Sequence, residues 1–304
     1  MHIERESINE DWHKNELEWW EKYSTLMAHQ WRLNKPFNMV VRSQLENDFT
    51  GYLFKKGGKL LDLGCGSGWL AAKFAEKGMS VVGIDFSCKQ IELAEQLKSK
   101  KNLRNARFEC ADLLKWGYGG HEGEFDSIFV NAFLHHLPPN ELRFILKNII
   151  KVLKPQGKVY IYEPLRCANS KRGKLLCLLD YVFCKGVSFL SGRIPDIFDL
   201  WDESFKKFVK NGYAASSPRE GPIDIRVIED CCLPVLKIKE IKGWHLYSIG
   251  FSMQVMLLKK HARMAYLPLV CFWYLADRLL FRLFDWKDFS DQGRFILCGI
   301  KLEK

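Results

Sequence analysis

A regular alternation of short aliphatic runs with helical stretches begins at Lys59 and constrains the fold more than any other feature. Such alternation is typical of βαβ units, which place parallel strands in one sheet and cover both faces with helices. The sequence therefore predicts five parallel strands, over residues 59–63, 80–85, 106–110, 125–131 and 157–162.

The intervening helices have recognisable ends. We expect them over residues 69–77, 88–98 and 141–153. Ser87 is placed to cap the amino end of the second helix, and Asn140 that of the third.

The remaining residues divide into flanking regions. Residues 1–56 show helical spacing of aromatic residues and predict an amino-terminal helical cap, while 57–164 form the α/β core. Residues 165–234 are interpreted as a substrate-side insertion, and 235–304 as closing strands (235–242 and 294–301) around an apolar helical insertion at 251–284. Together these regions predict a doubly wound, Rossmann-like α/β fold, mostly parallel with an antiparallel last strand.

A glycine-rich loop follows the first predicted strand and opens the first helix. It reads Asp62-Leu63-Gly64-Cys65-Gly66-Ser67-Gly68. Glycine lets the chain turn tightly and bring backbone amides against a ligand. A glycine turn without a ligand is the alternative, and three later features favour a ligand.

Two of these features are carboxylates that follow successive strands. Asp85, with Phe86 after it, ends the second strand, where a carboxylate can accept hydrogen bonds from ribose hydroxyls. Asp112 and Leu113 follow the third strand, where an acceptor beside an apolar side chain can hold an adenine ring. Asp112 could also be a surface helix cap.

The third feature is the fourth strand (125–131) and its exit. This stretch ends in Asn131 and continues as Ala-Phe-Leu-His135-His136-Leu. Its polar side chains are predicted to lie beside the reactive group of a bound cofactor. NAD is the nearest rival ligand, but the loop has Gly-x-Gly-x-Gly spacing and Ala71 stands where a later glycine would be needed.

With these motifs in view, residues 57–164 resemble the class I S-adenosylmethionine (SAM)-dependent methyltransferases. The Leu-His-His-Leu exit is similar to the small-molecule branch that includes the ubiquinone and menaquinone biosynthesis methyltransferases. The resemblance implies that SAM is the cofactor. It implies that the methionine and ribose part of SAM is lined by Gly64, Cys65, Gly66 and Gly68, and that Asp85 binds the ribose. The adenine would be held by Asp112 and Leu113. Asn131 would lie near the methionine, and Asp62 would steady the loop or reach the amino group.

Histidine is suited to remove a proton from a hydroxyl or an acidic carbon, so His135 and His136 are the candidate bases. Neighbouring residues do not both enter one pocket, so at most one is catalytic, and both could be structural. Some related quinone methyltransferases bind a divalent metal through acids beside this histidine. No acid occurs in this exit, and we expect no metal.

Net charge and composition leave several partners open. A net charge of +10 permits anionic partners, but the missing Asn/Asp-Pro-Pro-Tyr signature makes nucleic acid an unlikely substrate. A small molecule, including a lipid or isoprenoid-type precursor, is favoured over a protein or RNA substrate and over a non-catalytic SAM-binding module. The oligomeric state is not predicted.

The cysteines and the amino terminus bear on location. The ten cysteines are scattered through apolar runs, which favours reduced, buried thiols. The charged amino terminus lacks the features of a secretory signal, which predicts a cytoplasmic protein.

Residues 264–276 are uncharged, but this stretch of thirteen is too short to cross a bilayer. Basic residues flank it, so 251–284 is interpreted as an interfacial helix that contacts a membrane peripherally, or as a buried or dimer-forming helix.

Overall fold

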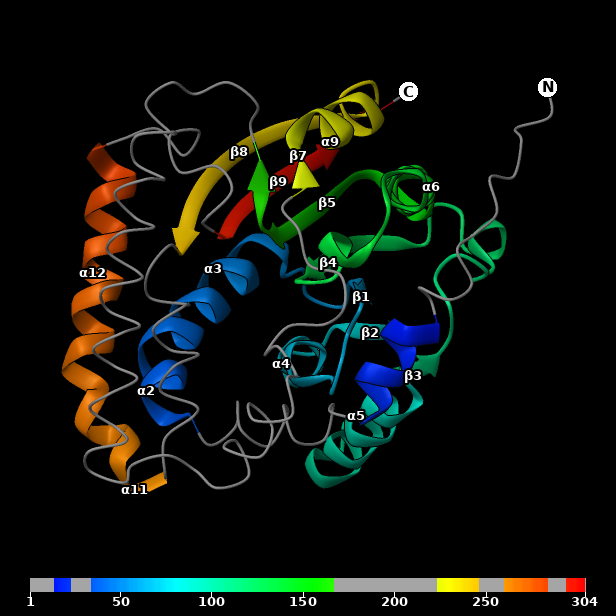
Figure 1. Cartoon of the computed structure of the whole chain (residues 1–304). Helices are drawn as coiled ribbons and strands as arrows, with labels where there is room; N and C mark the ends of the chain where they lie inside the picture. The colour runs from blue at the N-terminus through cyan, green and yellow to red at the C-terminus, as the bar shows by residue number, and fades with distance from the viewer. Residues whose placement is uncertain (1–13, 23–33, 167–222, 246–259, 284–293, 304) are drawn as a thin grey trace.

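The computed structural model describes residues 14–22, 34–166, 223–245, 260–283 and 294–303. A seven-stranded sheet lies at the centre, with the strand order β3-β2-β1-β4-β5-β9-β8 (Figure 1). The strands are β1 (Lys59–Leu63), β2 (Ser80–Asp85), β3 (Ala106–Cys110), β4 (Phe125–Asn131), β5 (Leu153–Glu163), β8 (Leu236–His245) and β9 (Arg294–Lys301). Within this sheet β9 alone runs against the others, since it pairs antiparallel with both β5 and β8. The predicted fold class is confirmed.

The helices between the strands begin close to where the sequence places them. They are α4 (Trp69–Glu76), α5 (Cys88–Lys101) and α6 (Pro139–Val152). The Ser87 hydroxyl accepts a hydrogen bond from the N–H of Gln90, as expected of a helix cap. The predicted Asn140 cap is wrong, because α6 already begins at Pro139, a residue whose missing N–H suits the first turn.

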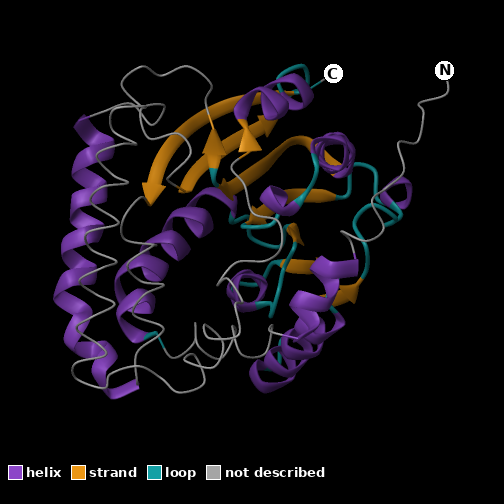
Figure 2. Cartoon of the chain, viewed as in Figure 1, coloured by secondary structure: helices purple, strands orange, loops and turns teal. Residues whose placement is uncertain are grey.

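Helices cover both faces of the sheet (Figure 2). One face packs on α4, α5 and α3 (Ser43–Leu53), around fully buried aromatic residues such as Phe49 and Phe129. The other packs on α6 and α9 (Ile225–Cys232), around aliphatic residues such as Ile128 and Ile145. Neighbouring residues of one strand thus serve opposite cores, as strand geometry requires.

The flanking regions are helical where the structure describes them. Before the sheet lie residues 14–22, α2 (Lys35–Phe37), the π-helical turn η1 (Asn38–Arg42) and α3. Before β9 lie α11 (Lys260–Arg263), the 3-10 turn η4 (Met264–Tyr266) and α12 (Leu267–Leu283), which packs beside β8 at the outer edge of the molecule (Figure 1). Most of the predicted insertion at 165–234 lies outside the described residues. Its ends form β6 (Leu165–Arg166), β7 (Ile223–Asp224) and α9.

Candidate active site

The glycine loop between β1 and α4 needs glycine for steric reasons. Gly64, Gly66 and Gly68 have φ angles of 66°, 52° and 71°, in the region that favours glycine. A Cβ on Gly64 would lie 2.6 Å from the Cβ of Phe133, and one on Gly68 would lie 2.8 Å from the Cβ of Ala94. The loop therefore passes close to two neighbouring elements.

The amides of this loop do not point at a ligand in the way the sequence analysis expects. The N–H groups of Gly64 and Cys65 both donate to the carbonyl of Ile84, at 2.9 and 3.0 Å. The N–H of Gly66 donates to Asp85 Oδ2 at 2.9 Å. The expectation of bare amides is wrong for these three residues, because the loop is fastened to β2. Glycine at 64 and 68 makes room for the side chains of Phe133 and Ala94.

Asp85 joins the loop to the start of α5. Its Oδ1 accepts the N–H of Ser87 at 3.0 Å, while Oδ2 accepts that of Gly66. Burial raises the pKa of Asp85 to about 6, against the effect of these two donors. A carboxylate offers about four lone-pair sites, so the predicted hydrogen bonds to ribose hydroxyls remain available. Phe86 is half-buried beside it.

Two buried acceptors beside the loop lack a hydrogen-bond partner among the described residues. These are Oδ2 of Asp62, at the end of β1, and Oε1 of Gln90, in the first turn of α5. Gln90 Oε1 lies 3.9 Å from the place of a Cβ on Gly66. Burial raises the pKa of Asp62 well above its ordinary range, and the nearby charge of Asp85 adds to the shift.

Leaving such atoms unpaired costs free energy, so both are poised for donors on a ligand. The ammonium and hydroxyl groups of SAM supply donors of this kind, and the residues present therefore fit this cofactor. Gln90 was missed by the sequence analysis, although its place just after Ser87 on the helix facing the loop was a usable signal.

The residues predicted to contact the adenine and the methionine part of SAM differ in how they are placed. Asp112 accepts the N–H of Leu114 at 2.9 Å and lies 3.4 Å from the ammonium of Lys115, so it shapes a turn after β3. Leu113 is buried in the core. The Cys65 side chain is also buried, which leaves its backbone as the part that can face a cofactor. The binding roles of these residues stay predictions.

Beyond β4 the chain turns through Asn131, which is half-buried, into the short 3-10 helix η3 (Leu134–His136). The structure sends the two histidines to different partners. His135 Nδ1 lies 2.6 Å from Oε2 of Glu163, the last residue of β5, and both side chains are almost fully buried. The other oxygen of Glu163 accepts the N–H groups of residues 133 and 134. His135 is thus held in the interior.

His136 contacts the amino-terminal helix at residues 14–22. Its Nδ1 is 3.0 Å from Glu16 Oε1, and its ring meets the edge of Trp20 at a centroid distance of 5.8 Å. The rings of His135 and His136 lie 4.1 Å apart between centroids, and the expectation that at most one of them is catalytic stays a prediction.

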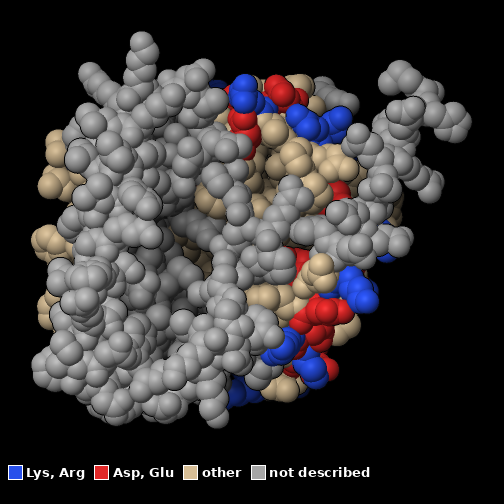
Figure 3. All heavy atoms as spheres, viewed as in Figure 1, with Lys and Arg blue, Asp and Glu red and all other residues tan. Residues whose placement is uncertain are grey.

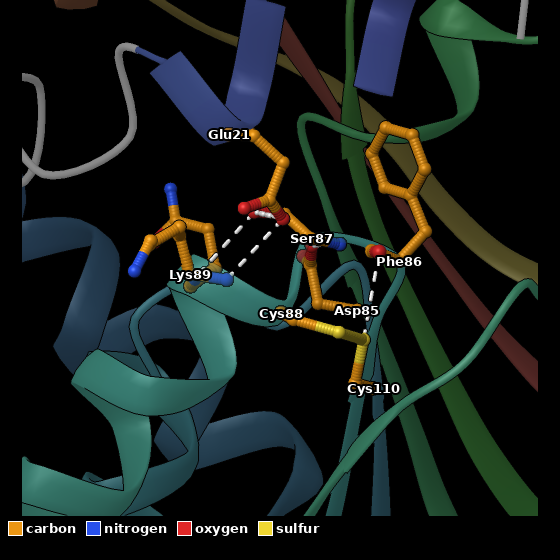
Figure 4. The surroundings of a disulfide bond; sticks show 8 residues. Glu21, Asp85, Phe86, Ser87, Cys88, Lys89 and Cys110 are labelled. Atoms are coloured by element: carbon orange, nitrogen blue, oxygen red, sulfur yellow. Dashed lines mark hydrogen bonds between the residues drawn. A yellow bond between two sulfur atoms is a disulfide. The ribbon is translucent and has the colours of Figure 1, made fainter. Parts of the chain in front are cut away.

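The helix at residues 14–22 joins the exits of two strands. Glu16 reaches His136 after β4, and Glu21 Oε1 accepts the Ser87 hydroxyl at 3.0 Å and the N–H of Lys89 at 3.3 Å after β2 (Figure 4). This helix therefore lies along the edge where the cofactor loop ends, as expected of a covering cap. Three other aromatic residues of the amino-terminal region, Trp12, Tyr23 and Trp31, lie outside the described residues.

Acidic residues do approach the histidines in space. The sequence analysis found no acid near the exit, but Glu16 and Glu163 lie beside His136 and His135. Both come from distant parts of the chain, so spacing gave no signal. Among the described residues no group of three or more His, Cys, Asp or Glu side chains is arranged to hold a metal ion, and the absence of a metal stays a prediction.

Two polar residues of β4 are not part of the site. Asp126 and Ser127 stand at the beginning of β4, at the opposite edge of the sheet. Burial raises the pKa of Asp126, but hydrogen bonds from Lys55 and Lys154 outweigh it and hold the value to about 2. Ser127 donates to the carbonyl of Leu53. The expectation that the polar residues of this strand lie beside the reactive group is wrong for these two.

A disulfide joins Cys88 at the start of α5 to Cys110 at the end of β3 (Figure 4). Both residues are exposed, so the expectation of reduced, buried thiols is wrong for this pair. The sheet register explains the proximity, because Cys110 pairs with Asp85, three residues before Cys88. Among the described cysteines the expectation is confirmed for Cys65, Cys231, Cys232 and Cys298, which are free and buried.

The fold and the site together define a protein that holds a nucleotide-like cofactor at the carboxyl ends of parallel strands. A family model described as "Methyltransferase domain" matches residues 60–157. The ubiquinone biosynthesis O-methyltransferase of Pelagibacter ubique is 33% identical over 62% of this chain and 77% of its own length.

An uncharacterized methyltransferase of Synechocystis is 36% identical over 37% of this chain, which spans half the length of that relative. A solved geranyl diphosphate methyltransferase, in complex with GPP and sinefungin, has the same fold, with a TM-score of 0.52 and 10% identity; the match covers 85% of this chain and 77% of that chain.

The chain belongs to the class I SAM-dependent methyltransferases, and its cofactor is S-adenosylmethionine.

Proposed function

We propose that this protein transfers a methyl group from SAM to a hydroxyl or another O, N or C acceptor of a small molecule, with a lipid or isoprenoid-type precursor as the favoured class. One observation carries the proposal: His136 Nδ1 lies 3.0 Å from Oε1 of Glu16, on the same helix whose Glu21 contacts Ser87 near Asp85. The similarity to the Pelagibacter ubiquinone biosynthesis O-methyltransferase supports an oxygen acceptor on a lipid-like molecule.

SAM, when bound, supplies an electrophilic methyl group. The chain's own residues hold the reactants and move a proton. Asp62, Gln90 and Asp85 provide acceptors that fix the cofactor beside the loop. Contact with Glu16 favours a His136 tautomer with the proton on Nδ1, which leaves the Nε2 lone pair to accept the proton of an acceptor hydroxyl. The helix at 14–22 helps to exclude water from this edge.

Two other functions compete with this proposal. A protein or RNA methyltransferase would use the net charge of +10 to bind an acidic macromolecule. A non-catalytic SAM-binding module would keep Asp62 and Asp85 without needing His136. The contact of the buried His136 with Glu16, which a binding module would not need, favours catalysis over simple binding.

Transfer of a labelled methyl group from SAM tests the proposal. The acceptor panel contains polyprenylated catechols, short-chain catechols, bulk RNA and a denatured protein extract. We expect label in the catechols and loss of transfer in His136→Ala. Transfer to RNA or protein alone would replace the proposal by its macromolecular rival. SAM binding without transfer to any acceptor would favour the binding module.

A cytoplasmic location is part of the same proposal, and the disulfide provides a test. A reducing cytoplasm keeps most exposed cysteine pairs reduced. Trapping of thiols in intact cells, followed by peptide mapping, should find Cys88 and Cys110 reduced. A fully oxidised pair would argue for another compartment.

A further inference from the structure

The outer face of α12 carries a continuous row of large apolar side chains. We call this row the α12 stripe, and it consists of Leu269, Phe272, Leu275, Leu279 and Leu283. These side chains are between 47% and 64% exposed. Their spacing of three or four residues puts them on one side of the helix. Figure 3 shows uncharged surface along the margin of the molecule where α12 lies.

The opposite face of α12 is bound to the domain. Val270 and Asp277 are fully buried, and Arg278 Nη2 donates to the carbonyl of Gly243 in β8 at 3.2 Å. The ring of Phe281 packs so closely on Gly243 that no side chain could fit there. The helix thus has two apolar faces, one packed on the protein and one exposed, and the stripe is not needed for packing within the described part of the chain.

The length of the helix corrects the sequence analysis. The helical stretch Met264–Leu283 has 20 residues and a mean hydropathy of 1.3 in its most apolar window, enough by length and composition to cross a bilayer. Spanning would pull Arg278 away from β8 and move it and the buried Asp277 into hydrocarbon, where charged groups are costly. A helix held on one face and apolar on the other instead lies in the plane of a membrane surface.

The sequence on the amino-terminal side of the stripe lacks acidic residues. No Asp or Glu occurs between Glu240 and Asp277, whereas Asp285, Asp288 and Asp291 follow α12 in the sequence. Arg282 is exposed in the last turn of α12. With a net charge of +10, two copies of this chain repel each other, while anionic headgroups attract it.

We propose that the α12 stripe docks the protein on an anionic lipid bilayer, with the helix parallel to the membrane surface. The proposal rests on the proposed function in one respect: a lipid-like acceptor would be taken from the membrane surface, which gives the protein a reason to dock there. The docking itself depends on α12 alone and not on His136 or the cofactor loop. Binding to vesicles and methyl transfer can therefore fail independently.

Vesicle co-sedimentation of the full chain tests the proposal. Phosphatidylcholine vesicles with and without phosphatidylglycerol are compared, using the double variant Leu275→Glu/Leu279→Glu. Leu233→Glu is the matched control, because Leu233 is also half-exposed but follows α9. We expect the wild-type chain to bind vesicles that contain phosphatidylglycerol. The double variant should bind about tenfold or more weakly, and the control should bind like the wild type.

Circular dichroism and SAM titration establish that the double variant is folded. Equal vesicle binding by the double variant and the wild type would overturn the proposal. The proposal would also be overturned if the wild-type protein did not bind vesicles but formed a dimer, and the double variant was a monomer. The stripe would then face a second copy of the chain. Loss of methyl transfer to soluble catechols with docking intact would count against the proposed function instead.

Discussion

The edge of the sheet that carries the glycine loop, here called the cofactor edge, differs from the outer edge at α12 in which groups it buries and which it exposes. At the cofactor edge polar groups are buried and turned inward, as Asp85 is, with its two backbone donors. At α12 apolar groups are turned outward, and Leu275 and Leu283 are each 64% exposed. Burying acceptors costs free energy unless a ligand meets them, and exposing apolar groups costs free energy unless another phase covers them.

The difference indicates two kinds of partner. The cofactor edge fits one small, donor-rich molecule, while the exposed apolar side chains of α12 suit an extended apolar surface. If the two edges are independent, changes at one should leave the function of the other unaltered.

The largest expected effect concerns the two histidines. His136→Ala should lower kcat about a hundredfold or more with SAM affinity kept, as loss of a general base does. Glu16→Gln should lower kcat less, because it only loosens the Nδ1 contact. Steady-state kinetics and SAM titration provide the measurement.

His135→Ala is the matched control for that experiment. It leaves Glu163 buried without its imidazole partner, so its main effect should be a lower free energy of unfolding, by about 3 kcal/mol. A larger loss of kcat in folded His135→Ala than in His136→Ala would reverse the assignment of the two residues.

The disulfide should contribute mainly to stability. Cys88 and Cys110 are 22 residues apart in sequence, and closing a loop of this length stabilises a fold by at most about 3 kcal/mol. Cys88→Ser should lower the melting temperature by several degrees and leave vesicle binding unaltered. Thermal unfolding with and without reductant checks this, since reductant should affect the wild type and not the variant. A change in vesicle binding would show that the two edges are coupled.

SAM affinity should depend on pH through Asp85. Its pKa of about 6 lies above the ordinary value, so the carboxyl is largely protonated near pH 5 and ionised near pH 7. The ionised form accepts hydrogen bonds from ribose hydroxyls better, and affinity should therefore rise by up to about tenfold over this interval. Titrations across the interval should show a flatter profile for Asp85→Asn. An affinity that fell with rising pH would contradict the assigned role.

The smallest effect is expected from the α12 stripe on cofactor binding. Leu275→Glu/Leu279→Glu should keep the SAM dissociation constant within about twofold, because these side chains point away from the domain. Isothermal titration of the double variant beside the Leu233→Glu control checks this. A larger shift would mean that α12 shapes the cofactor site.

The sequence predicts the cofactor edge well where the features are local. The bounds of four strands, β1 to β4, and the position of the glycine loop can be predicted from residues close together in the sequence. The period of side-chain burial and the steric needs of glycine both act over such short distances. Partners from distant segments could not be predicted, since Glu16, Glu163 and the Cys88–Cys110 pair meet only when the sheet assembles.

For the outer edge, the sequence predicts an apolar helix but not the length of that helix or its exposed face. Composition indicated an apolar helix with basic flanks, but not which face would be exposed. That depends on the packing of Phe281 and Arg278 on β8, a contact between segments 35 residues or more apart.

Isothermal titration of the full chain with SAM, its demethylated product and NAD tests the central claim most directly. We expect both sulfur-containing ligands to bind and NAD not to bind. Asp62→Asn and Asp85→Ala should each weaken SAM binding by about tenfold or more, through loss of a buried acceptor. Binding of NAD in place of SAM, or SAM binding unaltered by both substitutions, would contradict the account.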